Sequence, residues 1–334
     1  MKPAPRHSAA QVRLLAVDEA FAGQRLDNFL LRELKGVPKT HVYRMIRQGQ
    51  VRINKGRAHA DTRLTAGDMV RVPPVRTAQE PAVAPAPARA FEILYEDDAL
   101  IALNKPAGVA VHGGSGLAFG VIEQLRAARP AARFLELVHR LDRETSGVLL
   151  VAKKRSALTA LQKQLRERTT GKTYLALVEG AWPTHRKVLD APLARYLVPT
   201  PQGGEGERRV RVVEPGHPDA MRAVTLVRIL APVHLCGDTA PMTLLAVTIK
   251  TGRTHQIRVH LASAGHPIAG DDKYGRFEHN RALHKCGLKR MFLHAWRLRF
   301  AHPGDGREVV LQAELPGDLA RLLPAGASVL PAEQ

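Results

Sequence analysis

The stretch HRLDRETSG carries the carboxylate best placed to do chemistry, Asp142. Arg140 and Arg143 flank it, and nearby positive charge favours the ionised form of a carboxyl group. An ionised Asp can act as a general base, a metal ligand or a nucleophile. The residues of this stretch alone leave open a structural alternative, in which Asp142 caps a turn with the Thr and Ser that follow it.

A second stretch, KTGRTHQIRVH, gathers several nitrogen-bearing side chains. Thr254 can cap a helix that begins here, and Arg253 beside the helix N-terminus favours phosphate at this end. Arg258 follows about one helical turn later and can reach inward. His255 and His260 do not share a helical face, and their spacing differs from that of an HExxH zinc helix. We therefore expect no metal site.

Two further stretches contain polar or aromatic groups suited to RNA. Tyr174 stands in a basic context, KTY, where a tyrosine ring can stack on a base; the alternative is a half-buried tyrosine of a sheet, which spacing alone favours. The stretch LNKPAGVAVHGG places a rigid turn and a glycine-rich loop after an apolar run. Lys105 and His112 in it can contact phosphate, although the GxxxxGK[ST] pattern of a nucleotide-binding loop is absent.

The elements that must position these stretches divide into two parts. Residues 73–90 are rich in Pro and Ala and lack a hydrophobic period, which is typical of a semi-rigid linker. They separate a small basic module (20–72) from a large domain (91–325), and residues 1–19 are expected to form a flexible tail. In the small module, apolar spacing predicts a helix from Leu26 and a second helix opened by Pro38.

The large domain shows many strand-like segments and few helices between them. This pattern favours an α+β fold with a mixed or antiparallel sheet rather than a regular βαβ repeat. The expected helices cover 118–129 and 156–168, and Ser156 is expected to cap the second of them. The expected strands cover 99–103, 147–152, 173–178, 222–230, 243–250, 292–300 and 308–315.

The charge of the chain indicates a polyanionic partner. The formal net charge is +19, and RNA or DNA is the usual reason to carry such a charge. Residues 24–72 hold eleven Lys and Arg against four Asp and Glu. Arg44, Arg47, Arg52 and Lys55 are expected to follow a phosphate backbone. The alternatives are a solvated helix face and an Arg-rich composition inherited from a GC-rich genome.

The remaining composition argues against several classes of protein. Two cysteines are too few for a disulfide framework or a four-ligand zinc site, and this usage suits a reducing compartment. The N-terminus lacks the apolar run of a signal peptide, and no stretch reaches the roughly 18 apolar residues of a membrane span. We expect a soluble, cytoplasmic protein, and a monomer, although the sequence does not determine the oligomeric state.

Together these stretches closely resemble the RluA/RluC/RluD family of pseudouridine synthases. HRLDRETSG is similar to the family's catalytic motif, KTGRTHQIRVH to its arginine motif, the KTY stretch to its tyrosine motif, and LNKPAGVAVHGG to its first core motif. Residues 20–72 resemble an S4 RNA-binding domain. The resemblance covers residues 20–320, and the order of motifs is most similar to the RluC branch, which modifies 23S ribosomal RNA.

The resemblance implies a catalytic domain built on a long, mixed, mostly antiparallel sheet with a cleft across it. It implies no metal, no organic cofactor, and 23S ribosomal RNA or a large-subunit assembly intermediate as the partner, with target uridines around the peptidyl-transferase region. RNA contacts are expected at Arg140, Arg143, Lys105, His112, Arg253 and the basic residues of the S4 module.

The resemblance also assigns roles to three residues. Asp142 is implied as the nucleophile or base at the junction of sugar and base, Arg258 as its ion-pair partner, and Tyr174 as the ring that stacks on the flipped uracil. Arg140 would fill the gap that the flipped base leaves. Three routes stay open: attack at the anomeric carbon, attack at uracil carbon 6, or removal of the 2′ hydrogen to give a glycal.

Two other classes of function compete with this interpretation. A non-catalytic RNA-binding or ribosome-assembly protein would explain the S4 module and the charge, but not the carboxylate with a separate arginine motif. A nucleoside hydrolase or base glycosylase would need a pair of carboxylates with room for water, or a metal. Asp142 and Glu144, close together in one stretch, are weak evidence for such a pair.

Overall fold

The computed structural model describes residues 11–34, 36–75, 86–113, 119–198, 207–236 and 241–324. The chain forms two compact units, Met1–Pro85 and Ala86–Gln334. Their boundary falls inside the expected linker, of which residues 76–85 lie outside the described part of the chain. Among the described residues, no helix is both long and apolar enough to span a membrane.

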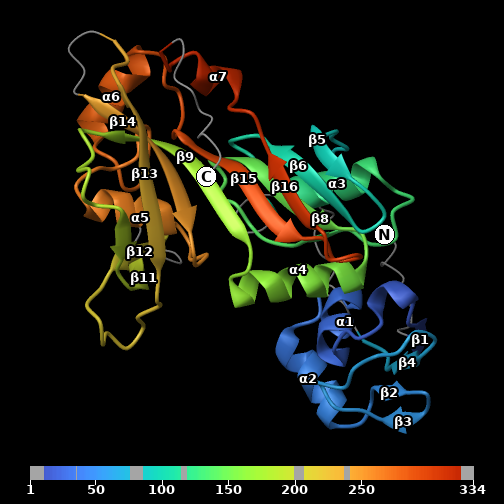
Figure 1. Ribbon diagram of the computed structural model, residues 1–334. Coiled ribbons are helices and arrows are strands. Elements are labelled where there is room, and N and C mark those ends of the chain that lie inside the picture. The colour runs from blue at the N-terminus through green and yellow to red at the C-terminus, as the bar shows by residue number, and fades with distance from the viewer. Residues whose placement is uncertain are drawn as a thin grey trace, which may run out of the picture. The chain divides into compact units, whose positions relative to one another are not determined.

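The N-terminal unit packs two helices on a small antiparallel sheet (Figure 1). The sheet has the strand order β1-β4-β2-β3. The expectation of a flexible tail over 1–19 is wrong for residues 13–16, because β1 pairs with β4 there. The sequence did not reveal this strand because four residues are too few to show a hydrophobic period. The elements are β1 (Arg13–Ala16), a 3-10 turn (Glu19–Phe21), α1 (Leu26–Glu33), α2 (Lys39–Arg47), β2 (Arg52–Ile53), β3 (Gly56–Arg57) and β4 (Met69–Val72).

The apolar spacing of this unit explains its core. Leu26, Phe29 and Leu30 recur at helical intervals and are all buried, as are Val42, Met45 and Ile46 of α2. Strands β2 and β3 are joined by Asn54 and Lys55, both with positive φ (49° and 71°). A two-residue turn of this kind matches the twist of a hairpin, so it places Lys55 at the tip.

The C-terminal unit is built on a ten-stranded sheet, which confirms the α+β prediction. The main order is β10-β13-β14-β9-β15-β8-β6-β5, with β16 paired to β15 and β7 to β8. Only the pairing of β15 with β8 is parallel among the described strands. The strands are β5 (Ile93–Glu96), β6 (Leu100–Lys105), β7 (Glu136–Leu137), β8 (Ser146–Ala152), β9 (Gly171–Glu179), β10 (Val188–Asp190), β13 (Val224–Val233), β14 (Met242–Ile249), β15 (Leu293–Ala301) and β16 (Glu308–Gln312).

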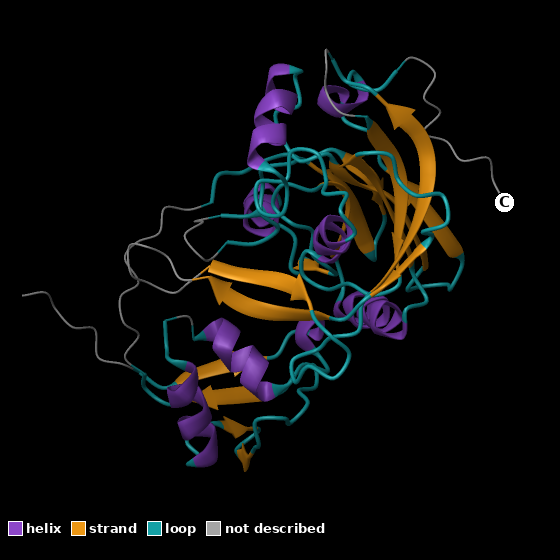
Figure 2. Ribbon diagram, turned by 90° about the vertical axis from the view of Figure 1, so that its left-hand side faces the viewer, coloured by secondary structure: helices purple, strands orange, loops and turns teal. Residues whose placement is uncertain are grey.

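Five helices and a separate hairpin complete this unit, which Figure 2 shows from a second direction. The sequence predicted α3 and α4 but not α6, α7 or the hairpin of β11 and β12. The prediction that Ser156 caps α4 is wrong, because Lys154 is the N-cap residue and its side chain makes no capping bond. These elements are α3 (Val121–Ala128), α4 (Arg155–Glu167), β11 (Leu193–Val198), β12 (Glu207–Val212), α5 (Gln256–Ser263), α6 (Phe277–Lys285) and α7 (Gly317–Ala320).

Alternating side chains of the sheet face two apolar clusters. In β9, Tyr174 and Ala176 belong to the larger cluster, which also holds side chains of α3 and α5. Leu177, which follows Ala176, belongs to a second cluster, with Leu283 of α6 and Leu319 of α7. The two-residue period of a strand therefore lets one sheet carry helices on both sides.

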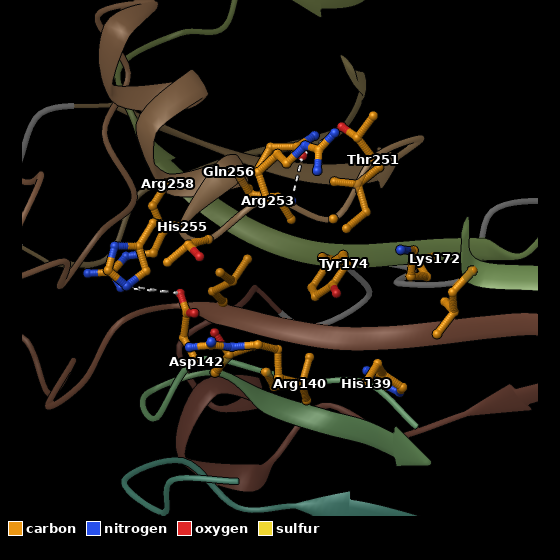
Figure 3. Close-up of a pocket in the computed structure, with 18 of the residues that line it drawn as sticks. His139, Arg140, Asp142, Lys172, Tyr174, Thr251, Arg253, His255, Gln256 and Arg258 are labelled. Carbon is orange, nitrogen blue, oxygen red and sulfur yellow. Dashed lines mark hydrogen bonds and ion pairs between the residues drawn. The ribbon is translucent and has the colours of Figure 1, made fainter. Parts of the chain in front are cut away.

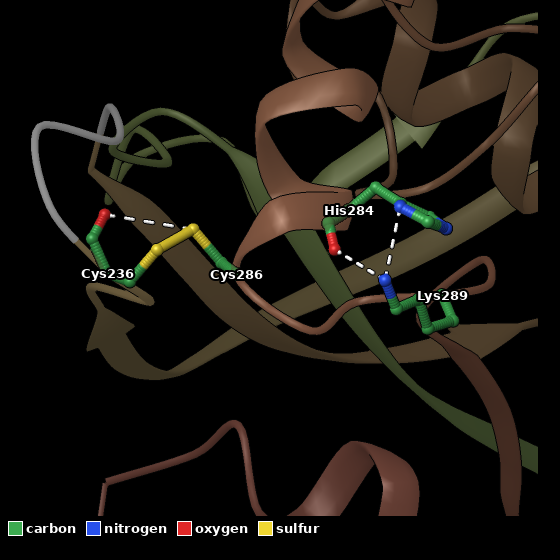
Figure 4. Close-up of a disulfide and its surroundings, with 4 residues drawn as sticks. All are labelled: Cys236, His284, Cys286 and Lys289. Atoms are coloured by element: carbon green, nitrogen blue, oxygen red, sulfur yellow. Dashed lines mark hydrogen bonds between the residues drawn. A yellow bond between two sulfur atoms is a disulfide. The ribbon is translucent and has the colours of Figure 1, made fainter.

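The two cysteines form a disulfide between Cys236 and Cys286, with 5.7 Å between their Cα atoms (Figure 4). Two cysteines are too few for a disulfide framework but enough for a single disulfide. The sequence did not predict this bond. Cys286 is the C-cap residue of α6, and Cys236 follows β13. The bridge thus ties the end of α6 to a segment beside the sheet.

Candidate active site

Asp142 lies in the loop between β7 and β8, just before the parallel contact of β8 with β15. Its carbonyl accepts a turn hydrogen bond from Thr145 N at 3.1 Å. Gly147 pairs with Ala295 of β15, and its φ of 111° is one that side chains rarely adopt. A Cβ at Gly147 would lie 2.2 Å from the carbonyl oxygen of Ala295. Only glycine lets β8 enter the sheet here, so this residue fixes where the loop ends.

Arg258 of α5 supplies the guanidinium that contacts Asp142. Its Nη1 donates to Asp142 Oδ2 at 3.3 Å, across 116 residues of sequence. The flanking arginines, which we expected to hold Asp142, do not provide this contact. Arg143 pairs with Glu144 instead, at 2.8 Å.

Asp271, which the sequence analysis did not single out, holds Arg258 in place. Arg258 Nε and Nη2 donate to the two carboxylate oxygens of Asp271, each at 2.7 Å. Burial alone would lower the pKa of Arg258, but the hydrogen bonds and charges of Asp271 and Asp142 raise it. Burial alone would raise the pKa of Asp271, but Arg258 outweighs burial and lowers it. The pair is therefore ionised, with one guanidinium edge left for Asp142.

His255 borders the same carboxylate. Its Nε2 lies 3.8 Å from Asp142 Oδ2, and its Nδ1 lies 2.8 Å from the Tyr274 hydroxyl. Burial lowers the pKa of His255 despite the charge of Asp142, which favours the neutral ring at pH 7. His255, with a φ of 52°, is the N-cap residue of α5. The expectation that Thr254 caps this helix is therefore wrong.

No described side chain caps α5, but its first residue, Gln256, binds the segment that leads into the helix. Its side-chain oxygen accepts from Arg253 N at 3.1 Å and from the Thr251 hydroxyl at 2.7 Å. Its amide nitrogen donates to Val224 O at 3.0 Å. The start of α5, and with it Arg258, is thereby attached to the first residue of β13.

Tyr174 of β9 lines the cleft opposite Asp142 (Figure 3). Its side chain is only 9% exposed, so most of the ring packs in the larger apolar cluster. Burial, and then the charge of Asp142, raises the pKa of Tyr174. Tyr174 is therefore a buried residue of the sheet, deeper than the half-buried position that spacing favours, and it still lines the cleft.

The cleft itself has a volume of about 520 Å³, within the usual range for small-molecule sites. Among the described residues that line it, Asp142 is the single carboxylate. Arg140 and Arg253, both expected RNA contacts, border it and are exposed. Lys172 of the KTY stretch also lines the cleft. Three further cations were missed because their own stretches carry no motif: Arg166, Arg168 and Arg195.

A second cavity, of about 690 Å³, lies on the other side of Asp142. His112 and Arg143, also expected RNA contacts, line this cavity rather than the first. Neither cavity offers a metal site, because no group of three or more His, Cys, Asp or Glu within the described ranges could hold an ion.

The expectation that Lys105 contacts phosphate is wrong, because its side chain is buried. It is 0% exposed, and its ammonium donates to the carbonyls of Pro106, Val109 and Arg143 at 2.7, 2.8 and 3.1 Å. Burial lowers the pKa of Lys105 to about 7, whereas three carbonyl acceptors match the three N–H groups of the charged form. Lys105 therefore attaches the loop after β6 to the residue that follows Asp142.

The basic residues expected to bind RNA in the N-terminal unit are all on its surface. Arg44 and Arg47 are exposed on α2, and Arg52 and Lys55 are exposed on the β2–β3 hairpin. The hairpin begins shortly after α2 ends, at Arg52 after Arg47, so the four cations follow one continuous segment.

Comparisons with known proteins agree with these motifs. Residues 99–263 match the RNA pseudouridylate synthase family, and residues 24–70 match the S4 domain. Human RNA Pseudouridylate Synthase Domain Containing 1 shares the fold with a TM-score of 0.54 and 27% identity, over 68% of this chain and 84% of that one. The human Domain Containing 4 protein matches with a TM-score of 0.53 and 27% identity, over 69% and 92%.

Curated bacterial relatives match nearly the whole chain. The ribosomal large subunit pseudouridine synthases C of Salmonella typhimurium and Escherichia coli K12 are each 52% identical over 93% of this chain and 96% of their own length. The Haemophilus influenzae protein of the same name is 49% identical over 94% and 95%. The chain therefore belongs to the RluC-type ribosomal large subunit pseudouridine synthases, RNA pseudouridine synthases with an S4 domain ahead of the catalytic domain.

Proposed function

We propose that this protein converts uridines of 23S ribosomal RNA to pseudouridine, with Asp142 acting at the junction of sugar and base. One observation carries the proposal: Asp142 is 19% exposed at a cationic cleft, with Arg258 behind it. The names of the bacterial relatives support the large ribosomal subunit as the substrate. Target uridines around the peptidyl-transferase region, and action in the cytoplasm on RNA or an assembly intermediate, are parts of the same proposal.

The reaction rearranges one nucleotide without a second substrate. The bond between C1′ and N1 of uracil breaks, the uracil rotates, and a bond between C1′ and C5 forms. C5 loses its hydrogen as a proton, and N1 gains one. The target base must first leave its stack, which costs a few kcal/mol, and the cleft has the volume to receive it.

The geometry suits Asp142 to this chemistry as an available anion. Its contact with Arg258 is single and long, 3.3 Å, whereas the contacts of Arg258 with Asp271 are 2.7 Å. Oδ1 of Asp142 accepts no hydrogen bond from the described residues. Arg258 therefore orients and stabilises the carboxylate without saturating it, which leaves an oxygen free to attack carbon or remove a proton.

Tyr174 and Arg140 fit supporting roles around the extruded base. The ring of Tyr174 borders the cleft, and base–aromatic stacking is worth about 1–3 kcal/mol. Arg140 lines both cavities beside Asp142, so its guanidinium can occupy the space that the base leaves in the RNA stack.

The experiment that tests this function replaces Asp142 by Asn. We expect Asp142→Asn to abolish tritium release from 23S ribosomal RNA labelled at uracil C5, because the amide cannot serve as an anion. The shape is conserved, so we expect the dissociation constant for RNA to change less than threefold.

Three outcomes would contradict the proposal. Loss of RNA binding by Asp142→Asn would make the residue structural. Tritium release at the wild-type rate would remove it from the chemistry. Free uracil from the wild-type reaction would favour a glycosylase, because the C1′–C5 bond would then not form.

A further inference from the structure

Helix α6 presents an exposed face that the proposed chemistry does not use. Phe277, Arg281, His284 and Lys285 are all exposed, and their spacing places them on one side of the helix. Phe277 is 78% exposed, the largest such value among the large apolar side chains of the described residues. The opposite side of α6 is held by Leu283, which is fully buried.

This face continues from the candidate active site. A cavity of about 730 Å³ borders Phe277, Arg281 and Lys285. Asn280 and His284 line both this cavity and the 690 Å³ cavity beside Asp142. A chain of nucleotides can therefore pass from the carboxylate to the ring of Phe277 along one continuous surface.

The charge of this surface suits a phosphate backbone. No carboxylate pairs with Arg281 or Lys285 in the part of the chain that the structure describes. Lys289 donates to the carbonyl and to Nδ1 of His284 at 3.0 and 3.2 Å (Figure 4). Two exposed carboxylates lie close to this face: Asp272 borders the cavity next to Phe277, and Glu278 lies on α6 about one turn before Arg281.

An exposed aromatic ring among unpaired cations favours an unpaired nucleotide. Single-stranded RNA is bound by stacking of bases on aromatic rings and by cations along the backbone. A protein partner would instead be expected to meet a broader apolar patch. Among the exposed residues of α6, Phe277 is the only large apolar side chain.

We propose that the exposed face of α6 binds a stretch of the substrate RNA adjoining the target uridine, with Phe277 stacked on an unpaired base and Arg281 and Lys285 at phosphates. The inference rests on the proposed function, because it assumes that RNA occupies the cleft at Asp142. It assigns α6 a part in substrate binding and no part in the chemical step.

The test measures binding and chemistry separately, with the full-length protein and an unmodified 23S ribosomal RNA transcript. We expect Phe277→Ala to raise the dissociation constant about tenfold, the lower part of the range for one stacked base. The single-turnover rate of tritium release at saturating RNA should not change. Phe277→Tyr, which keeps an aromatic face, should bind as wild type, whereas Phe277→Leu should resemble Phe277→Ala.

A second variant tests the cations. Arg281→Gln combined with Lys285→Gln should reduce the slope of log Kd against log salt by about 1.4, since each phosphate contact to a single strand contributes roughly 0.7. Thermal unfolding should be unaffected in all variants, because the changed side chains are exposed.

Several results would overturn the inference. The inference is wrong if Phe277→Ala binds the transcript as tightly as the wild type does. It is equally wrong if Phe277→Ala impairs only association with a protein or with another copy of the chain. A fall in the saturated rate would place Phe277 in the chemistry instead. Absence of tritium release by the wild type would refute the proposed function itself, and the binding data would still decide the role of α6.

Discussion

At the scale of single residues, the site depends on how two carboxylates share one guanidinium. Arg258 gives two short hydrogen bonds to Asp271, which is fully buried, and one long bond to Asp142 at the cleft. Removing one partner of a buried ion pair leaves an uncompensated charge and costs about 3–5 kcal/mol. Asp271 is therefore a positioning residue: it aims Arg258, and Arg258 aims Asp142.

Replacing Asp271 by Asn separates positioning from chemistry. We expect Asp271→Asn to lower the free energy of unfolding by about 3 kcal/mol and kcat at least tenfold, with a smaller effect on KM for RNA. Since the pKa of Asp271 is lowered from its ordinary value of 3.8, its stabilising contribution is present above that pH and is lost on acidification.

Denaturant titrations at several pH values check this expectation. The difference in unfolding free energy between wild type and Asp271→Asn should shrink as the pH falls below 3.8. A difference that does not depend on pH would show that the ion pair is not its source. An unchanged kcat would show that Arg258 needs no buried partner to serve Asp142.

At the scale of elements, the approach of β8 to β15 sets the place of the catalytic loop. The two strands are parallel, and their pairing begins at Ser146, four residues after Asp142. The hydroxyl oxygen of Ser146 is also 2.9 Å from Nδ1 of His294. The loop therefore ends at a rigid junction, and any residue that pushes the strands apart should move the carboxylate.

A methyl group at Gly147 should disturb this junction. We expect Gly147→Ala to lower the free energy of unfolding by about 3 kcal/mol, from left-handed backbone strain of about 1 kcal/mol and overpacking of about 1–3 kcal/mol. Activity should fall with it, because the Asp142 loop must shift. Chemical denaturation and tritium release measure the two effects.

Gly306→Ala is the matched control. Its φ of 76° is also positive, but nothing lies within 4 Å of an added Cβ. It should cost about 1 kcal/mol and leave activity intact. Equal losses for both variants would mean that backbone conformation, rather than the contact with Ala295, explains the need for glycine at 147.

At the scale of the whole molecule, the net charge of +19 implies salt-sensitive binding of a long polyanion. The cations are distributed over both units, and those of the cleft stand beside a single carboxylate. We infer that the S4 unit contributes affinity, because its exposed cations follow one segment, and that the cleft contributes the chemistry, because Asp142 lines it.

Replacing four S4 cations by Gln should test this division of roles. With Arg44, Arg47, Arg52 and Lys55 changed together, we expect the slope of log Kd against log salt to fall by about 3, at roughly 0.7–0.9 for each phosphate contact. The single-turnover rate at saturating 23S ribosomal RNA should stay within twofold of wild type.

Two arginines that already pair with carboxylates provide the comparison. Arg299 pairs with Glu308, and Arg307 pairs with Asp305. Replacing both by Gln should leave the salt slope nearly unchanged. An S4 variant with an unaltered slope would place the RNA contacts elsewhere on the molecule.

The sequence by itself determined the local structure and the kind of chemistry. Apolar spacing located α1 and α2, the apolar runs located most strands of the large sheet, and the motifs around Asp142 and Arg258 identified the family. These features depend on neighbours a few residues apart, so a sequence pattern records them. Short or irregular elements such as β1 and α6 leave too weak a pattern.

The tertiary structure alone decided which groups meet. The family resemblance had implied that Arg258 pairs with Asp142, but only the fold placed Asp271 behind Arg258 and buried Lys105 under the loop. Such contacts join residues far apart in the chain, and they follow from strand order and register in the sheet. No local period encodes that register, which is why the geometry of the site had to come from the fold.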